Sequence, residues 1–209
     1  MNEPDGALSL GVRSLLAPHR SRLAQRGFTL IELSIVVVIV GVLAVLGILG
    51  YRRYVRTAHM AEATNLTNGI RAAQEAHKTE SGVYADVSTD TDSLYPASSP
   101  GSFVTQWGGD CKNCKGGDAN GWKKLAVHSP DPVIYGYATV AGVGAGALAA
   151  TPPPRSFSMS APASAAGELK TTDPYYVTVA WGDTDADGNP CIVMSYSTSG
   201  QLVVQSAGE

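Results

Sequence analysis

Residues 26–51, RGFTLIELSIVVVIVGVLAVLGILGY, contain a long apolar run that begins just after an acidic residue. No residue from Leu33 to Gly50 carries a formal charge, and most are valine, isoleucine or leucine. A run of this length is enough for a helix to cross the hydrocarbon core of a bilayer. Glu32 stands at the start of the run, where a carboxylate carried to the membrane centre would cost about 2.5 to 3.5 kcal/mol, so it needs a partner.

The residues at the start of this stretch carry a specific resemblance. RGFTLIE followed by an apolar run resembles the N-terminal signature of type IV prepilins and pseudopilins. The resemblance implies that a prepilin peptidase removes a leader of residues 1–27 by cutting between Gly27 and Phe28, and that Phe28 is then methylated on its new amine. It also implies that Glu32 pairs with the N-terminal amine of a neighbouring copy. The physics agrees, because a carboxylate and an ammonium group in a low dielectric are each costly alone.

One departure from the family pattern lies inside the run. Many members have a helix-kinking proline where this chain has Leu49. Local unwinding in a filament would then fall to the glycines of the run, which are Gly41, Gly47 and Gly50. The plainer alternative is a signal peptide or a simple anchor. A cleavable signal has a shorter apolar core followed by a site of small residues, and a simple anchor leaves the signature unexplained.

Composition places the chain among membrane-associated or globular proteins. Of its 209 residues, 44% are apolar and only 16% are charged, which excludes a disordered chain. The formal net charge of −3 argues against broad electrostatic binding to nucleic acid. No pairing of a nucleophile with a base stands out, so we do not expect an enzyme and assign no catalytic residue.

The helical pattern continues beyond the apolar run. One set of residues recurs every three or four positions: Met60, Ala63, Leu66, Ile70, Ala73 and His77. Polar residues, among them Gln74, fall between them. The helix should end near residue 81, because Gly82 offers a left-handed C-terminal conformation. A helix from residue 28 to about 81 would be roughly 80 Å long, so its first half must lie in lipid or against neighbouring copies.

The remainder of the chain predicts one globular head. The membrane or filament half of the helix occupies residues 28–51, and the head occupies residues 52–209. Residues 85–130 are punctuated by glycine and proline and are predicted to be mostly loops. The head is therefore expected to take its regular structure from the second half of the helix and from the C-terminal region.

Strand patterns appear in the C-terminal region. Four segments have the composition or alternation of strands: 133–140, 175–181, 191–196 and 201–204. The stretch 141–167 is expected to be a flexible loop in which Phe157 and Met159 could form a short strand. We therefore expect an α+β fold, in which the long N-terminal helix packs against an antiparallel sheet over about 133–204. The family resemblance implies the same pilin-like architecture.

Three acids at alternate positions, Asp183, Asp185 and Asp187, lie in a turn-forming stretch before Gly188. This spacing can aim several oxygens at one hard cation, so calcium is the candidate cofactor. The EF-hand pattern fails, because Met194 stands where a bidentate glutamate is required. Acidic turns in this region of some pilins and pseudopilins bind calcium. The plainer alternative is a β-turn rich in aspartate and glycine, and no cofactor is required in that case.

The chain has three cysteines, Cys111, Cys114 and Cys191, and their position beyond the span indicates an oxidising compartment. A bridge from Cys191 to Cys111 or Cys114 would close a loop of roughly 80 residues and contribute about 4 to 5 kcal/mol by the chain-entropy estimate. Type IV pilins and pseudopilins, which the chain resembles, often have such a disulfide in the C-terminal region. The resemblance therefore implies a bridge from Cys191 to Cys111 or Cys114. A local Cys111–Cys114 bridge would close almost nothing. Zinc bound by the cysteines and His128 is a weaker alternative, because an oxidising compartment disfavours it.

Lysine and tryptophan residues are grouped before the first strand. The group consists of Trp107, Lys112, Lys115, Trp122, Lys123 and Lys124. Such a patch could stack on single-stranded DNA and neutralise it. A solvated lysine-rich loop agrees better with the acidic total charge, so DNA stays a hypothesis for a subunit at a filament tip.

Together these features predict a structural subunit that is made as an inner-membrane precursor and polymerises with its own copies into an extracellular filament. Its partners would be prepilin peptidase, the pilus or secretion assembly machinery and other copies of the chain. A pseudopilin of a type II secretion machine, in a periplasmic filament, is the closest alternative. A minor or tip pilin that binds DNA or another ligand is the second alternative.

Overall fold

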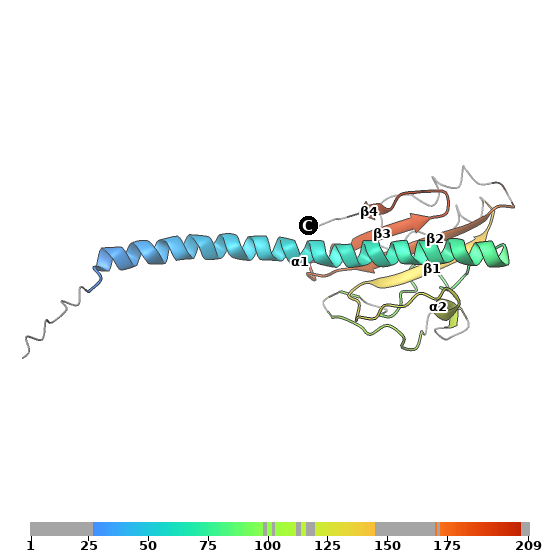
Figure 1. Ribbon diagram of the computed structural model, residues 1–209, viewed down its shortest axis with the longest axis horizontal. Helices are drawn as coiled ribbons and strands as arrows, with labels where there is room; N and C mark the ends of the chain where they lie inside the picture. The colour runs from blue at the N-terminus through green and yellow to red at the C-terminus, as the bar shows by residue number, and fades with distance from the viewer. Residues whose placement is uncertain are drawn as a thin grey trace, which may run out of the picture. The chain divides into compact units, whose positions relative to one another are not determined.

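The computed structural model of the chain describes residues 27–97, 100–101, 103–111, 114–115, 120–144, 170 and 172–205. Its elements within these residues (Figure 1) are α1 (Leu30–Ser81), α2 (Asn120–Lys124), β1 (Gly136–Val143), β2 (Pro174–Gly182), β3 (Cys191–Tyr196) and β4 (Val203–Gln205). The chain divides into two compact units, Met1–Val45 and Leu46–Glu209. Helix α1 begins in the first unit and ends in the second.

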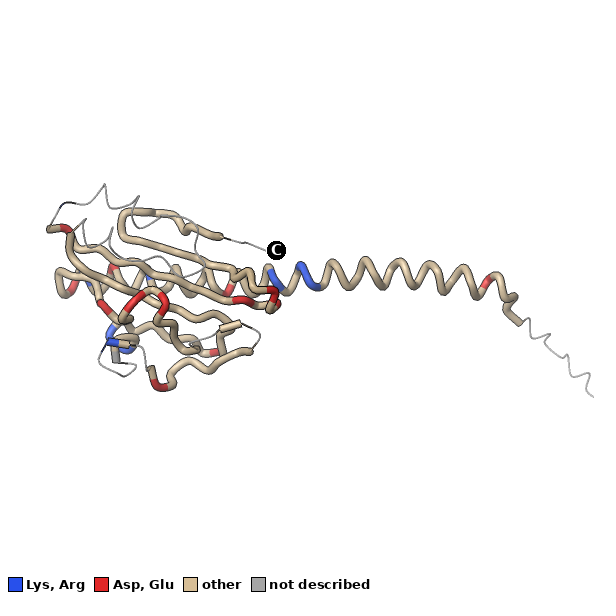
Figure 2. The backbone as a smooth tube through the Cα atoms, turned by 180° about the vertical axis from the view of Figure 1, so that it is seen from behind, with Lys and Arg blue, Asp and Glu red and all other residues tan. Residues whose placement is uncertain are grey.

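The first unit contains most of the apolar part of α1. Every described residue from Gly27 to Val45 is exposed. Figure 2 shows this part as an uncharged stretch of helix that begins beside an acidic residue. By length and composition, α1 is the one helix among the described residues that could cross a membrane. Its apolar surface therefore needs lipid or another protein surface as cover.

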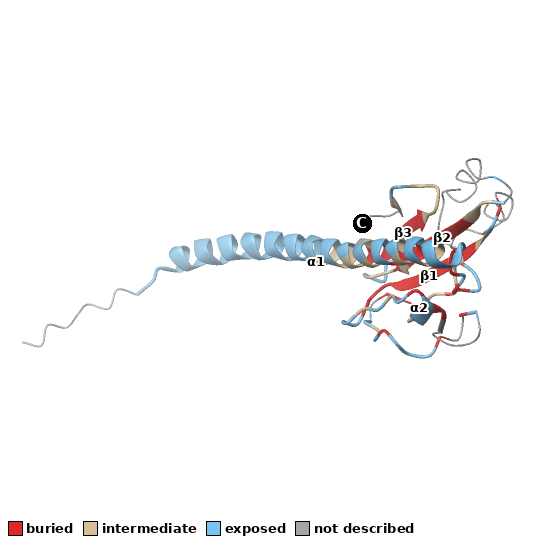
Figure 3. Ribbon diagram, turned by 45° about the vertical axis from the view of Figure 1, so that its right-hand side comes forward, coloured by how far each residue is buried: buried red, intermediate tan, exposed pale blue. Residues whose placement is uncertain are grey.

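The part of α1 in the second unit buries one face. The buried residues are Ala63, Thr67, Ile70 and Gln74, spaced three or four positions apart as the helical repeat requires. This face packs against the sheet, whose strands β1, β2 and β3 are coloured as largely buried in Figure 3. The prediction of a long helix packed on an antiparallel sheet is confirmed. Gln74, which the periodicity placed on the polar side, is nevertheless 0% exposed.

Helix α1 ends at Ser81, just before a glycine. Gly82 has a φ of 80°, and its backbone N donates to Lys78 O at 2.8 Å. A side chain would be strained in this left-handed conformation, so glycine lets the chain leave the helix here.

The four strands form an antiparallel meander in the order β1-β2-β3-β4. The register sets Thr139 opposite Thr178, and their hydroxyl oxygens lie 3.0 Å apart in the core. The first strand begins at Gly136 rather than at the predicted Val133. The reason is that Val133 pairs with Thr105 of the preceding loop region in an isolated bridge, with mutual backbone hydrogen bonds of 2.7 and 2.9 Å.

The segment between α1 and β1 is organised around aromatic rings. Three of the rings, Tyr95, Trp107 and Trp122, belong to this segment, and Tyr137 of β1 completes the cluster. Neighbouring ring centroids lie 5.0 to 5.8 Å apart. The short helix α2 carries one of these rings and was not predicted, because five residues are too few to show a helical period. The short strand predicted around 157–159 lies outside the described residues.

Candidate functional site

Thr29 and Glu32 close the first turn of α1. Glu32 Oε2 accepts from the Thr29 backbone N at 2.9 Å and from Thr29 Oγ1 at 2.8 Å, and Glu32 N donates to Thr29 Oγ1 at 3.2 Å. This reciprocal arrangement is a capping box, which satisfies amide groups that the start of a helix leaves unpaired. The capping role was not predicted, although T-x-x-E before an apolar run is its sequence signal.

The capping box leaves one carboxylate oxygen of Glu32 open to a second partner. Both bonds that the carboxylate accepts from Thr29 go to Oε2, and the side chain is exposed. A donor from another chain can therefore approach Oε1 without breaking the cap. The predicted pairing with the amine of Phe28 lies between two copies, so it stays a prediction.

The predicted cleavage point lies just before the helix. Gly27 and Phe28 are both non-helical and exposed, and Phe28 is 90% exposed. Exposed backbone outside regular structure is the form that a peptidase can reach. A Cβ built on Gly27 meets nothing within 4 Å, so the fold itself does not require glycine here. Any need for Gly27 must come from a partner that handles this bond. The leader residues before it lie outside the described part.

The three aspartates of the acidic turn converge between β2 and β3. One carboxylate oxygen from each of Asp183, Asp185 and Asp187 lies within 4.8 Å of the other two. The backbone of the turn holds two of these side chains. Gly188 N donates to Asp183 Oδ2 at 3.0 Å. Asn189 N donates to Asp187 Oδ1 at 2.7 Å.

One oxygen of the turn has no donor. Asp183 Oδ1 is buried and has no hydrogen-bond partner among the described residues. A buried carboxylate oxygen without a donor is costly, and a hard cation would satisfy it. Three carboxylates fit calcium, which takes six to eight oxygen ligands and can complete its shell with carbonyls and water. The residues present therefore fit the candidate metal.

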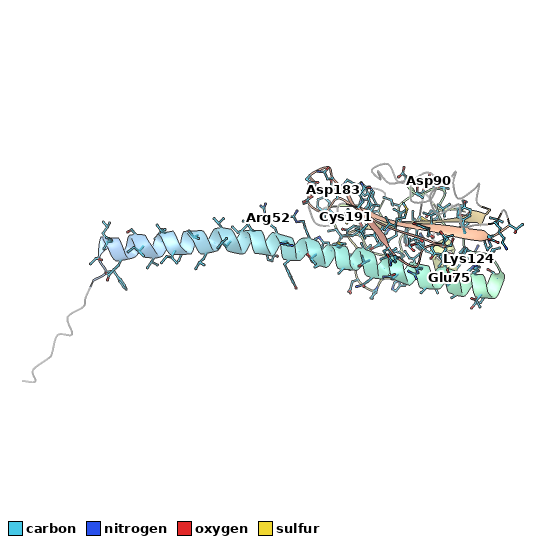
Figure 4. All side chains as sticks on the ribbon, turned by 90° about the horizontal axis from the view of Figure 1, so that it is seen from above. Arg52, Glu75, Asp90, Lys124, Asp183 and Cys191 are labelled. Carbon is cyan, nitrogen blue, oxygen red and sulfur yellow. A yellow bond between two sulfur atoms is a disulfide. The ribbon has the colours of Figure 1, made fainter. Side chains whose placement is uncertain are left out.

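A basic side chain of α1 lies against the acidic turn. Arg56 Nη1 is 3.6 Å from Asp185 Oδ2, and both side chains are partly exposed. Such a surface pair contributes about 0 to 1 kcal/mol. Figure 4 labels Asp183 and Arg52, and the two lie at the same end of the head. A cavity of about 430 Å³ at this end is lined by Arg52, Arg56 and Asp185, among others. A metal that uses Asp185 must compete with the guanidinium of Arg56.

The cysteines pair differently from the prediction. The structure joins Cys111 to Cys114, with Cα atoms 5.4 Å apart, and leaves Cys191 as a free thiol. The predicted bridge from Cys191 to either partner is therefore wrong, as is the zinc alternative, because two of the thiols are oxidised. Cys191 instead pairs with Gly182 in the sheet and contacts the Tyr135 hydroxyl. Burial raises the pKa of the Cys191 thiol, which makes it a weak nucleophile and metal ligand.

The group of lysines and tryptophans does not form the stacking surface that the DNA hypothesis requires. Trp107 and Trp122 are only 5% and 1% exposed, so both side chains belong to the core. Lys115 forms an ion pair with Asp86. The other lysines are Lys112, which lies outside the described residues, and Lys123 and Lys124, which are exposed on α2. DNA bases cannot stack on rings that other side chains cover. Aromatic stacking therefore no longer supports the DNA hypothesis.

Comparison with known proteins matches the N-terminal segment. Residues 22–48 match the prokaryotic N-terminal methylation motif. No curated protein and no solved structure matches the chain. The matched segment includes the predicted cleavage point, the capping box and most of the apolar run.

Proposed function

Since residues 22–48 carry the N-terminal methylation motif, the signature of type IV pilins and pseudopilins, we propose that the chain is a structural subunit that polymerises into a filament. The observation that carries this proposal is the exposed apolar helix that follows the cleavage point. Every large apolar side chain from Leu30 to Leu49 is at least 53% exposed. One chain alone leaves this surface uncovered, so it needs lipid or other chains.

Helix α1 lies first in the membrane and afterwards in the core of the filament. In the precursor, the apolar run spans the inner membrane. After prepilin peptidase cuts the bond between Gly27 and Phe28 and Phe28 is methylated, the same surface packs against α1 of neighbouring copies in the filament core. The exchange of lipid for protein is feasible because both are apolar, and close van der Waals packing between helices favours the protein side.

Glu32 selects the position of each new subunit. Its Oε1 accepts from the N-terminal amine of Phe28 on an adjacent copy, while Oε2 keeps its bonds to Thr29. In the apolar filament core, a carboxylate and an ammonium group without each other would be strongly destabilising. A subunit that enters out of register would leave both charges unpaired, so the pair favours one arrangement of neighbours.

The acidic turn has a structural part in this proposal. Asp183, Asp185 and Asp187 hold one calcium ion, which neutralises three converging carboxylates and supplies the partner that Asp183 Oδ1 lacks. The ion holds the connection between β2 and β3 in place. The turn therefore acts in stability and not in chemistry.

A pseudopilin of a type II secretion machine shares these N-terminal features. No proline interrupts α1 between Leu30 and Ser81, and an acidic turn follows β2. Neither feature distinguishes a pilin from a pseudopilin. The two proposals differ in where the filament ends. A pilin filament extends beyond the cell surface, whereas a pseudopilus stays in the periplasm.

Electron microscopy of sheared surface filaments, with mass spectrometry of their subunits, tests the proposal. We expect the filaments to contain this chain beginning at N-methylated Phe28. Processed chain that stays in the membrane fraction, with no surface filament containing it, would favour the pseudopilin. The variant Gly27→Val is the matched control, because the fold has room for a side chain there. It should fold and insert but remain uncut, and uncut chain in filaments would contradict the assembly route.

A further inference from the structure

A cavity of about 300 Å³ lies beside α2 in the head. Its wall includes Tyr95, Trp107, Trp122, Lys123, Val127 and His128. Figure 4 labels Lys124 of α2 and Asp183 of the acidic turn, and they lie at different ends of the head. The cavity therefore shares no residue with the acidic turn, and its volume is at the lower end of the range for small-ligand pockets.

The aromatic rings of the wall are closely packed. The rings of Tyr95 and Trp122 stack with centroids 5.7 Å apart, and Trp107 packs edge-on against each of them at 5.0 and 5.3 Å. The Tyr95 hydroxyl accepts from Gly108 N at 2.7 Å and donates to Gly109 O at 3.2 Å. Both polar functions of Tyr95 are thus used within the protein, so the ring serves the cavity as an apolar surface.

One residue of the wall carries a buried polar group that has no acceptor among the described residues. Trp122 is 1% exposed, and its Nε1 has no hydrogen-bond partner among the described residues. A buried N–H without an acceptor is rare in proteins and needs an explanation. The wall also holds Ala126 at a φ of 52°, a left-handed conformation that is unfavourable for a residue other than glycine. Strain of this kind is found preferentially where a ligand is held.

The side chains of the wall define the chemistry of a ligand. Among the described residues, none of the lining side chains carries a carboxylate or a carboxamide. Besides the Tyr95 hydroxyl, the polar side-chain functions of the wall residues are the indole N–H groups of Trp107 and Trp122, the Lys123 ammonium group and the His128 ring. A matching ligand must offer acceptors and negative charge to these groups and a flat apolar body to the rings. We propose that this cavity binds a small planar ring that bears a carboxylate.

Benzoate is a suitable probe, and the indole N–H signals of the full-length chain in detergent micelles are a suitable readout. The chain has three tryptophans, and Trp181 of β2 does not line the cavity, so its signal is an internal control. Trp122→Phe identifies the Trp122 signal by its loss. Benzoate should move the Trp122 signal in a saturable way, because a bound ring and carboxylate change the surroundings of an indole that lines the cavity. Trp181 should stay in place.

Two further probes separate the ring from the charge. Acetate has the carboxylate without the ring, and benzyl alcohol has the ring without the charge. Each should bind at least about tenfold more weakly than benzoate if both parts are recognised. Absence of a saturable Trp122 shift up to about 20 mM benzoate would overturn the proposal, since even a small ligand of ordinary efficiency would bind by then. Equal binding of benzyl alcohol and benzoate would overturn it as well.

Lys123 and Lys124 provide a matched pair of variants. Both are exposed on α2, but only Lys123 lines the cavity. Lys123→Gln should weaken benzoate binding by about three- to tenfold, because it removes a charge-assisted contact. Lys124→Gln should leave the affinity within about twofold, since a lysine outside the cavity adds only a screened attraction. Equal losses in the two variants would mean that benzoate responds to general charge, and the proposed site would be wrong.

Discussion

Gln74 Nε2 on α1 donates to Thr139 Oγ1 on β1 at 2.9 Å, so a buried carboxamide joins the helix to the sheet. The same side chain bonds both backbone groups of Ala85. Its Nε2 donates to Ala85 O at 2.8 Å, and Ala85 N donates to Gln74 Oε1 at 2.8 Å. Helix, sheet and the segment between them therefore meet at one side chain, and every bond of this group lies away from water.

Gln74→Ala should lower the free energy of unfolding by about 3 to 5 kcal/mol, because it leaves the buried backbone groups of Ala85 unpaired and opens a cavity. Urea unfolding of the full-length chain in detergent, followed by near-ultraviolet circular dichroism, measures the loss. Asn65→Ala is the matched control, since Asn65 is exposed on the same helix. It should change stability by less than about 0.5 kcal/mol. Similar losses in the two variants would show that Gln74 is not a structural link.

The burial of Gln74 also shows where sequence reasoning reaches its limit. The apolar run, the end of α1 near Gly82 and the strand alternation depend on neighbours within a few residues, so their patterns are readable in the sequence. A glutamine is buried only where distant groups satisfy it. The partner Thr139 is 65 positions away. Helical periodicity alone therefore assigned Gln74 to the wrong face.

Some candidate sites can likewise be read from a short stretch of sequence, whereas others depend on contacts between distant residues. The cleavage point, Glu32 and the three aspartates each lie in a short stretch, so the sequence could single them out. The disulfide could not be chosen from loop entropy, because the position of Cys191 in β3 decides which sulfurs can meet. The spacing of Trp107 and Trp122 likewise could not show that these rings pack on each other in the core.

The buried tyrosines should make the head sensitive to alkali. Burial raises the pKa of Tyr176 to about 12, and burial together with the Glu62 carboxylate raises the pKa of Tyr137. In the unfolded chain these hydroxyls ionise near pH 10. They should therefore leave stability unchanged below about pH 10 and reduce it as the pH rises from about 10 through about 12, since only the unfolded state releases the protons.

Absorbance of tyrosinate and circular dichroism, recorded in one alkaline titration, check this expectation. The ionisation of the buried tyrosines should coincide with loss of structure. Tyr176→Phe should make stability fall less steeply between about pH 10 and 12, because one group no longer contributes. Complete ionisation of all tyrosines while the fold persists would contradict the assignment.

Calcium should stabilise the head through the acidic turn. At a free concentration of 100 times the dissociation constant, binding to the folded state alone adds about 2.7 kcal/mol. Calorimetric melting of the full-length chain with calcium or with a chelator measures the effect. Asp183→Asn should abolish it, and Asp131→Asn, at an exposed position outside the turn, should preserve it. A titration without binding at millimolar calcium would rule out the site.

Arg56→Gln should tighten calcium binding by about two- to fivefold, because the guanidinium at 3.6 Å from Asp185 competes for that carboxylate and repels the cation. Titration calorimetry at fixed ionic strength measures the change, which should shrink as salt is added. Arg53→Gln removes a charge from an exposed neighbouring position and should have a smaller effect. Weaker calcium binding in Arg56→Gln would mean that Arg56 supports the turn rather than competing with the metal.

The two roles of Glu32 can be separated by substitution. Glu32→Gln keeps an oxygen that can accept from Thr29, so the capping box persists, but it removes the charge that pairs with the amine of Phe28. Filament yield should fall by more than about tenfold, because an ammonium group is left without its partner in an apolar core. Thr29→Ala does the converse. It removes the cap at a cost of about 1 kcal/mol and keeps the charge, so filament yield should change little.

Sheared filaments quantified by immunoblotting measure assembly in these variants, and mass spectrometry of the mature N-terminus measures processing. Both variants should be cut and methylated at Phe28, since neither changes the cleaved bond. Filaments in normal number from Glu32→Gln would refute the charge pair. An equal loss of filaments in Thr29→Ala would show instead that the start of α1 must be well formed for assembly, because the variant retains the carboxylate and lacks only the cap.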